Sequence, residues 1–232
     1  MKQFKMFFEI SAFLFMTACS SSKSIQTAYT AAQQQALTPD QVLQNLKDGN
    51  SRFVKNDMLK RNLVMQAQAA SAGQYPEAAI ISCIDSRIPV EQVFDAGIGD
   101  MFVGRVAGNF VNTDLLGSLE YACKVSGAKL IVILGHSSCG AVKSAIDQVK
   151  LGNITALLSN IQPAIALSQN FQYDKSSKND AYTDLVAKNN VLHTIEVIKQ
   201  DSPILNDMLH NGTIKIVGAM YDIKTGVISF IE

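Results

Sequence analysis

The sequence predicts an α/β fold with a central, mainly parallel β-sheet flanked by helices. Short apolar runs without charged residues alternate with longer stretches of helical character. The apolar runs read as buried parallel strands, because such strands are covered on both faces. The chain has 232 residues and a hydrophobic fraction of 47%, which is enough for one sizeable core. We therefore expect a single folded domain.

The first residues have the pattern of an export signal. Lys2 and Lys5 precede an apolar stretch over residues 6–16, which is too short to span a bilayer and carries one charge, Glu9. The small residues Thr17 and Ala18 then lead to a cysteine. This order of charge, apolar residues and small residues predicts cleavage and export.

The cysteine that follows these small residues, Cys19, resembles the acceptor of a bacterial lipoprotein box, although Met16 stands where leucine is usual. We expect a signal peptide over residues 1–18, a lipid on Cys19 and a flexible, Ser- and Gln-rich tether over residues 19–37. The implied location is the periplasm or cell envelope, with the membrane contacted only through this lipid. A soluble periplasmic protein with an ordinary secretory signal is the alternative.

The predicted domain covers residues 38–232 and begins with a helix. Thr38 suits the cap, Pro39 the first helical position, and Gln41 completes a capping box. Further helices are expected over residues 113–126, 139–149 and 154–209, the last with an interruption around 172–179.

Five segments are expected to be strands because they are short, apolar and bounded by turn residues. They cover residues 78–83, 101–103, 129–135, 214–218 and 226–230.

Chemically reactive side chains follow two of these strands. Cys83, Asp85 and Arg87 lie at the end of the first, and His136 and Cys139 at the end of the third. Open α/β sheets place their sites beyond the carboxyl ends of the strands, so these groups are expected to meet. Two thiolates, an imidazole and one open position make a catalytic zinc site, and sulfur ligands favour zinc over magnesium or calcium.

A disulfide between Cys83 and Cys139 is the alternative, because exported proteins meet oxidising conditions. The chain has four cysteines, and three remain if Cys19 carries a lipid, so they cannot all pair. Cys123 lies on an apolar helix face and is interpreted as a buried thiol. His193 and His210 are interpreted as structural rather than catalytic.

The pattern around these residues resembles the signature of the β-class carbonic anhydrases. The matching segments run from about Gln41 to the C-terminus and include Cys83-x-Asp85-x-Arg87, Gly99–Val103, Arg105-x-Ala107-Gly108-Asn109, Ser118–Ala122 and Gly135-His136-Ser137-Ser138-Cys139-Gly140. The resemblance implies the β-carbonic anhydrase fold and the reversible hydration of carbon dioxide to bicarbonate.

The resemblance also implies roles for the site residues. Cys83, His136 and Cys139 would hold one Zn²⁺ per chain, with hydroxide as the fourth ligand. Asp85 would orient that hydroxide, or ligate the zinc itself in a closed form, and Arg87 would hold Asp85.

The substrate pocket and the assembly are implied by the same resemblance, which is to a plant-type site. Gln74, Phe102, Tyr121 and Gly140 match residues that contact substrate, and a partner subunit completes each site in a homodimer or a dimer of dimers. Val106 departs from the family, which often has asparagine there, so the hydrogen bonds of that asparagine are not expected.

Three other functions are considered. A zinc hydrolase of a related heteroallene, such as carbon disulfide, would keep the same ligands. A non-catalytic zinc-binding lipoprotein would not need the Asp85–Arg87 pair, and a redox protein would not need His136. Lysine plus arginine and aspartate plus glutamate both number 20, so there is no basic field for nucleic acid.

Overall fold

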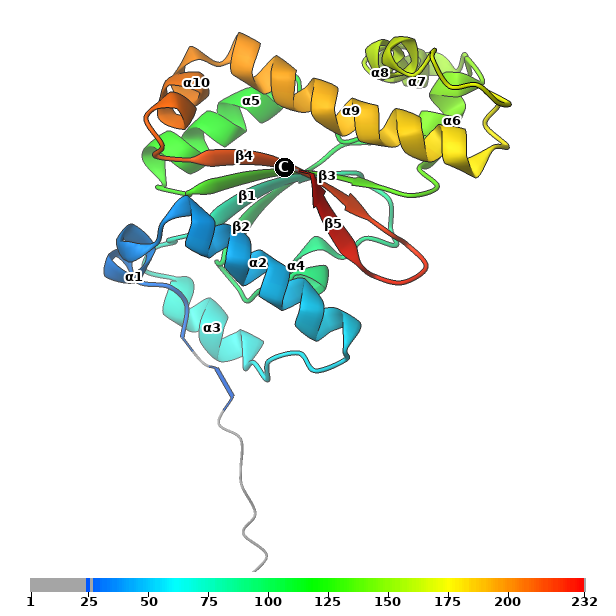
Figure 1. The fold of residues 1–232 in the computed structure, drawn as a ribbon. Coiled ribbons are helices and arrows are strands. Elements are labelled where there is room, and N and C mark those ends of the chain that lie inside the picture. The colour runs from blue at the N-terminus through cyan, green and yellow to red at the C-terminus, as the bar shows by residue number, and fades with distance from the viewer. Residues whose placement is uncertain (1–23, 26, 232) are drawn as a thin grey trace, which may run out of the picture.

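The protein is described by a computed structural model over residues 24–25 and 27–231 (Figure 1). The predictions for Cys19 and for the signal peptide lie outside these residues. In chain order the elements are α1 (Ala31–Ala36), α2 (Pro39–Val54), α3 (Leu63–Ala70), β1 (Ala78–Ser82), α4 (Val90–Val93), β2 (Met101–Arg105), α5 (Thr113–Glu120), the π-helix η1 (Tyr121–Val125), β3 (Leu130–His136), α6 (Gly140–Ile146), α7 (Gly152–Ser159), α8 (Gln162–Leu167), α9 (Asp180–Asp201), α10 (Pro203–His210), β4 (Lys215–Tyr221) and β5 (Ile228–Ile231).

The five strands form one sheet in the order β2-β1-β3-β4-β5, and all neighbours are parallel except β4 and β5. This confirms the predicted α/β class. The final strand is antiparallel because a short turn after β4 returns the chain directly, without a crossover helix. The two edges of the sheet within the described chain are β2 and β5.

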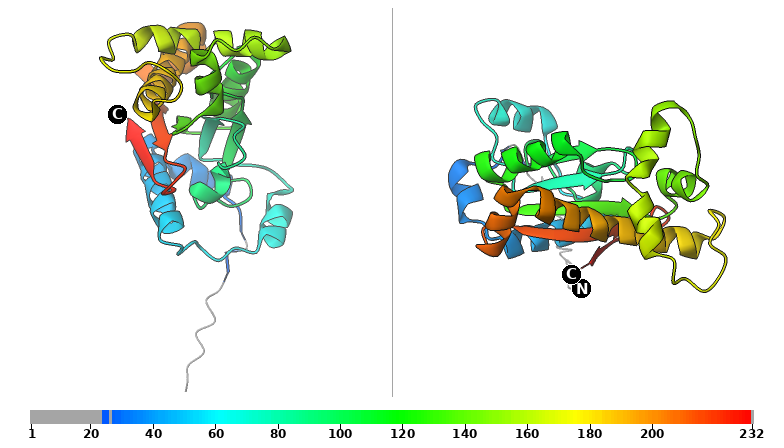
Figure 2. Two further views of the ribbon diagram at one scale, coloured as in Figure 1. Left: turned by 90° about the vertical axis from the view of Figure 1, so that its right-hand side faces the viewer. Right: turned by 90° about the horizontal axis from the view of Figure 1, so that it is seen from above.

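The sheet separates two cores. Figures 1 and 2 show α2, α3 and α4 on one side and α5, α9 and α10 on the other. Side chains alternate along each strand, so Ile80 and Val132 belong to one core while Ile81 and Ile131 belong to the other. This two-sided burial explains why β1 and β3 read as uninterrupted apolar runs in the sequence.

Several helix boundaries follow from local sequence. Thr38 caps α2, and the reciprocal hydrogen bonds with Gln41 form the predicted capping box. The helix predicted over residues 113–126 is present, but its last turn is the π-helix η1. Cys123 is 2% exposed in that turn, as expected, and burial raises the pKa of its thiol to about 12.

The segment after the predicted signal differs from the expectation of a flexible tether. Thr30 and Gln33 form a second capping box that starts α1. Gln34 is buried and donates from Nε2 to the carbonyl oxygens of Pro76 (2.6 Å) and Ser126 (2.8 Å). These contacts join α1 to the body of the protein. The composition of the segment could not predict them, because their partners lie far away in the sequence.

Candidate zinc site

The predicted metal ligands meet at the carboxyl edge of the sheet. Cys83 follows β1, His136 is the last residue of β3, and β1 and β3 are parallel neighbours. Cys139 stands at the N-terminal cap of α6. The ligand atoms of these three residues lie within 4.8 Å of one another, and the three side chains are buried.

The histidine of this cluster is prepared to bind a cation. His136 Nδ1 lies 2.9 Å from the carbonyl oxygen of Ser137, which can only accept, so Nδ1 carries the proton. The Nε2 atom is buried and has no hydrogen-bond partner among the described residues. A buried nitrogen lone pair without a partner is costly, and a metal ion would satisfy it.

A hydrogen bond joins the two cysteine side chains of the cluster and shifts their pKa values in opposite directions. A hydrogen bond from Cys139 lowers the pKa of Cys83 well below its usual range, against the effect of burial, and a hydrogen bond from the Gly108 N–H at 3.4 Å lowers it further. The same hydrogen bond and burial raise the pKa of Cys139. The structure has both cysteines free, so the alternative disulfide is not formed. Two cysteine sulfurs and a free imidazole nitrogen are a donor set that fits Zn²⁺.

Asp85 lies beside the cluster and is held by Arg87. Arg87 Nε donates to Asp85 Oδ1 at 2.9 Å and Nη2 donates to Oδ2 at 2.7 Å, which is a bidentate pair. The Arg87 hydrogen bond lowers the pKa of Asp85 to about 2. Because both carboxylate oxygens contact Arg87, Asp85 is not part of the three-residue ligand cluster in this structure. In this structure Asp85 pairs with Arg87 instead of joining the three ligand residues.

A second arginine, whose role was not predicted from the sequence, fixes the loop after β1. Arg105 Nε donates to the carbonyl oxygen of Cys83 at 3.0 Å, and its Nη2 donates to that of Asp85 at 2.6 Å. Arg105 is the last residue of β2, next to β1. The sequence signal that could have indicated this role was the position of Arg105 at the end of a strand. Polar side chains at the ends of parallel strands meet at the carboxyl edge of the sheet.

The predicted substrate residues do not all reach this cluster. Gly140 directly follows Cys139, and a Cβ at this position would meet no atom within 4 Å, so space is open there. Phe102 pairs with Ala79 near the start of the strands, about 13 Å along the sheet from Cys83. Phe102 and Tyr121 contact each other edge to face, with ring centroids 6.3 Å apart.

Phe102 and Tyr121 instead line a groove of about 610 Å³ along the edge strand β2 and helix α5. Gln74 is exposed in the loop before β1. Within one chain, therefore, Phe102 and Tyr121 belong to a groove separate from the metal ligands.

The two other histidines of the described chain, His193 and His210, lie outside the ligand cluster. His210 is exposed and its Nδ1 lies 2.8 Å from the carbonyl oxygen of Asn206, near the end of α10. His193 is partly buried on α9.

A mainly parallel sheet with a buried Cys-His-Cys cluster at its carboxyl edge is typical of an α/β metalloprotein, and three such ligands are typical of a catalytic zinc site. Residues 78–228 match the family model described as carbonic anhydrase. Carbonic anhydrase 2 of Mycobacterium tuberculosis is 34% identical over 187 residues, which is 78% of this chain and 87% of the relative.

Solved structures agree with the sequence comparison. A β-carbonic anhydrase of Coccomyxa, solved with acetazolamide, matches 70% of this chain and 74% of its own with 27% identity and a TM-score of 0.62. One of two tetrameric β-carbonic anhydrases of Sordaria macrospora matches 71% and 84% with 24% identity and a TM-score of 0.63. The chain belongs to the carbonic anhydrase family, and within it to the β class.

Proposed function

We propose that the protein hydrates carbon dioxide reversibly at a zinc ion held by Cys83, His136 and Cys139. The observation that carries this proposal is the cluster itself, with three ligand atoms within 4.8 Å and an unpartnered His136 Nε2. When bound, zinc lowers the pKa of a coordinated water towards about 7 and thereby supplies hydroxide at neutral pH. Because the three ligand side chains are buried, they make few contacts with solvent.

Asp85 and Arg87 complete the proposed chemistry. Arg87 keeps Asp85 ionised, because the paired hydrogen bonds lower the pKa of that carboxyl to about 2. Asp85 is therefore available as a hydrogen-bond acceptor for the proton of the nucleophile, and this contact orients the nucleophile towards carbon dioxide. Arg87 positions Asp85 and keeps it out of the ligand cluster.

The direct test is elemental analysis of the purified chain together with a stopped-flow hydration assay. We expect about one zinc per chain, since three protein ligands leave one open position. We also expect hydration activity to be lost on chelation and restored by added zinc. A chain without zinc but with a disulfide between Cys83 and Cys139 would contradict the proposal.

The assembly proposed for this enzyme is a homodimer or a dimer of dimers. The edge strand β2 and the adjoining groove with Phe102 and Tyr121 support it, because an open strand edge beside an apolar groove suits another subunit. The Sordaria relatives are tetrameric. Sedimentation at micromolar concentration tests this assembly, and an active species of one chain would exclude it.

The location proposed for the enzyme is the bacterial periplasm or cell envelope, with a lipid on Cys19. The order of basic, apolar and small residues before this cysteine supports cleavage and lipidation there. Within the described residues, no helix is both long enough and apolar enough to span a bilayer. Mass spectrometry of the native N-terminus tests the proposal, and an intact, unmodified Met1 would exclude it.

A further inference from the structure

The start of the described chain is joined to the loop between α2 and α3. The Ile25 N–H donates to the carbonyl oxygen of Lys60 at 2.8 Å, and the Asn62 N–H donates to that of Ile25 at 2.9 Å. Gln66 Nε2 also donates to the carbonyl oxygen of Thr27 at 3.1 Å. The chain therefore reaches the body at a defined place, beside residues 60–62.

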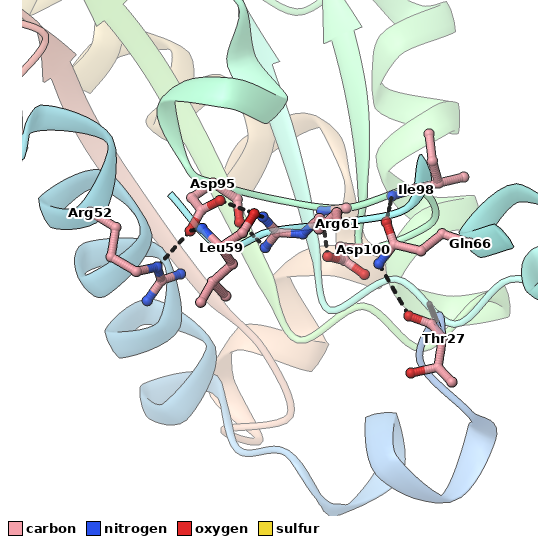
Figure 3. Close-up of polar contacts among 9 residues, drawn as sticks. Thr27, Arg52, Leu59, Arg61, Gln66, Asp95, Ile98 and Asp100 are labelled. Carbon is pink, nitrogen blue, oxygen red and sulfur yellow. Dashed lines mark hydrogen bonds and ion pairs between the residues drawn. The ribbon is translucent and has the colours of Figure 1, made fainter. Parts of the chain in front are cut away.

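Buried charges hold this loop against the body of the protein (Figure 3). The side chain of Asp95 is 0% exposed and accepts hydrogen bonds from Arg52 Nε at 2.5 Å and from Arg61. The Leu59 N–H donates to the same carboxylate at 3.2 Å. These contacts hold the loop to the body at Leu59 and Arg61.

Apolar side chains gather around the point where the chain reaches the body. They lie on the loop, on the first turn of α3 and on the adjoining N-terminal segment. Figure 1 and the left-hand view of Figure 2 show these three parts together at the lower end of the molecule. We call this surface the docking face; its residues and exposed fractions are Ile25 (37%), Met58 (39%), Leu59 (43%), Leu63 (54%) and Val64 (69%).

The charge next to the docking face is more basic than acidic. Lys55 and Lys60 are exposed on the same loop, together with one acidic residue, Asp57. Apolar side chains bordered by lysines are the composition that binds the interface of a bilayer containing anionic lipids. A self-complementary contact between two copies would instead bring lysines of like charge together.

We propose that the docking face rests on the surface of the bilayer to which the chain is anchored. The proposal depends on the lipid proposed for Cys19. Five residues lead from Cys19 to Ser24 and span at most about 17 Å when fully extended. Since Ile25 is bonded to the loop, an anchored chain has no room to turn the docking face far from the lipid.

Docking of this kind fixes the orientation of the enzyme on the membrane. A lipid alone keeps this end of the protein close to the bilayer but does not fix the angle between the protein and the membrane surface. Insertion of the docking face into the headgroup region adds apolar contact and lysine–phosphate attraction at a second place. The zinc site then keeps a constant direction relative to the membrane that carries the enzyme.

Hydrogen–deuterium exchange tests the docking. The native lipidated chain is bound to vesicles of phosphatidylethanolamine and phosphatidylglycerol, and the Cys19→Ser chain is measured free in solution. We expect amides of residues 55–65 to exchange about tenfold more slowly on vesicles, because lipid covers them. Val64→Asp should abolish this protection, whereas Val125→Asp, at an equally exposed residue of η1, should keep it.

The outcomes separate the docking from the anchor. Mass spectrometry that finds no lipid on Cys19 overturns both proposals. A lipidated chain with unchanged exchange over residues 55–65 overturns the docking and leaves the anchor. Protection that appears in the free Cys19→Ser chain and grows with protein concentration assigns the face to a second copy, and also overturns the docking.

Discussion

Two polar clusters lie at different edges of the same sheet, and they differ in whether their hydrogen bonds are complete. At the carboxyl edge, His136 Nε2 is buried without a partner among the described residues. Near the amino edge, buried Asp95 accepts hydrogen bonds from Arg52, Arg61 and the Leu59 N–H. The incomplete cluster is suited to bind a ligand, whereas the complete one is suited to hold the fold together.

The largest expected effect follows from removing a ligand of the incomplete cluster. Cys83→Ala or Cys139→Ala should strip the zinc and abolish hydration, because two remaining ligands do not hold the ion. Zinc content and hydration rate measure this. The matched control is Cys123→Ala, which removes a buried thiol outside the cluster and should keep both zinc and activity. Zinc retained at full occupancy in Cys83→Ala would show that another residue ligates it.

The Asp85–Arg87 pair should have the next largest effect. Asp85→Ala removes the acceptor that orients the nucleophile, and we expect kcat to fall by ~10²-fold while zinc content stays unchanged. Arg87→Ala frees both oxygens of Asp85 and should reduce kcat similarly. Hydration kinetics and zinc analysis across pH measure these effects.

Two controls separate positioning from general electrostatics. Arg87→Lys keeps the charge but loses the paired geometry, so its rate should lie between those of the wild type and Arg87→Ala. Lys143→Ala removes an exposed ion pair with Asp180 (3.2 Å) and should leave the rate near normal. Near-normal activity in both Asp85→Ala and Arg87→Ala would make the pair structural.

The carboxyl edge could be predicted from the sequence because its signals are local. Cys83, Asp85 and His136 stand directly at the ends of two apolar strands, and a general rule of α/β sheets brings strand ends together. The positions of the five strands along the chain followed from the same apolar pattern. By contrast, Phe102 and Tyr121 lie in a groove away from the metal ligands, and their predicted contact with substrate stays a prediction.

The amino edge could not be predicted, because its contacts join residues far apart in the chain. Asp95 lies 43 residues after Arg52 and 34 after Arg61, and no motif relates the three. The packing of the N-terminal segment against the body could not be predicted for the same reason, because the hydrogen-bond partners of Gln34 lie 42 and 92 residues away in the chain. Composition described that segment as polar and small but could not show what it packs against.

A substitution in the complete cluster around Asp95 should change the stability of the fold rather than the hydration activity. Asp95→Asn leaves two arginines without their shared carboxylate, and we expect the free energy of unfolding to fall by about 3–5 kcal/mol. Urea unfolding measures this, and zinc content per folded chain should stay the same. The matched control is Asp40→Asn, at an exposed ion pair with Lys215, which should cost about 0–1 kcal/mol. Equal effects of the two variants would contradict the assignment.

The smallest expected effect concerns a carboxyl at the amino edge whose hydrogen bonds do not offset its burial. Glu77 Oε2 accepts from Asn45 Nδ2 (2.8 Å) and Tyr29 Oη (3.2 Å). Burial, assisted by the charge of Asp100, nevertheless raises the pKa of Glu77 to about 7. The folded chain therefore keeps a proton on Glu77 that the unfolded chain, with a pKa near 4.5, loses. This difference lowers the free energy of unfolding as pH rises from about 4.5 to about 7.

Glu77→Gln removes this ionisation while it keeps an oxygen that can accept both hydrogen bonds. Relative to the wild type, the variant should be about equally stable at pH 4 and more stable by about 1–3 kcal/mol at pH 8, because each pKa unit is worth about 1.4 kcal/mol. Unfolding in urea at both pH values measures the difference. The exposed Asp48→Asn serves as control and should change stability by less than about 0.5 kcal/mol at either pH. If Glu77→Gln instead destabilises at pH 8, the ionised carboxylate stabilises the fold as Asp95 does, and the amino edge then contains two complete clusters rather than one.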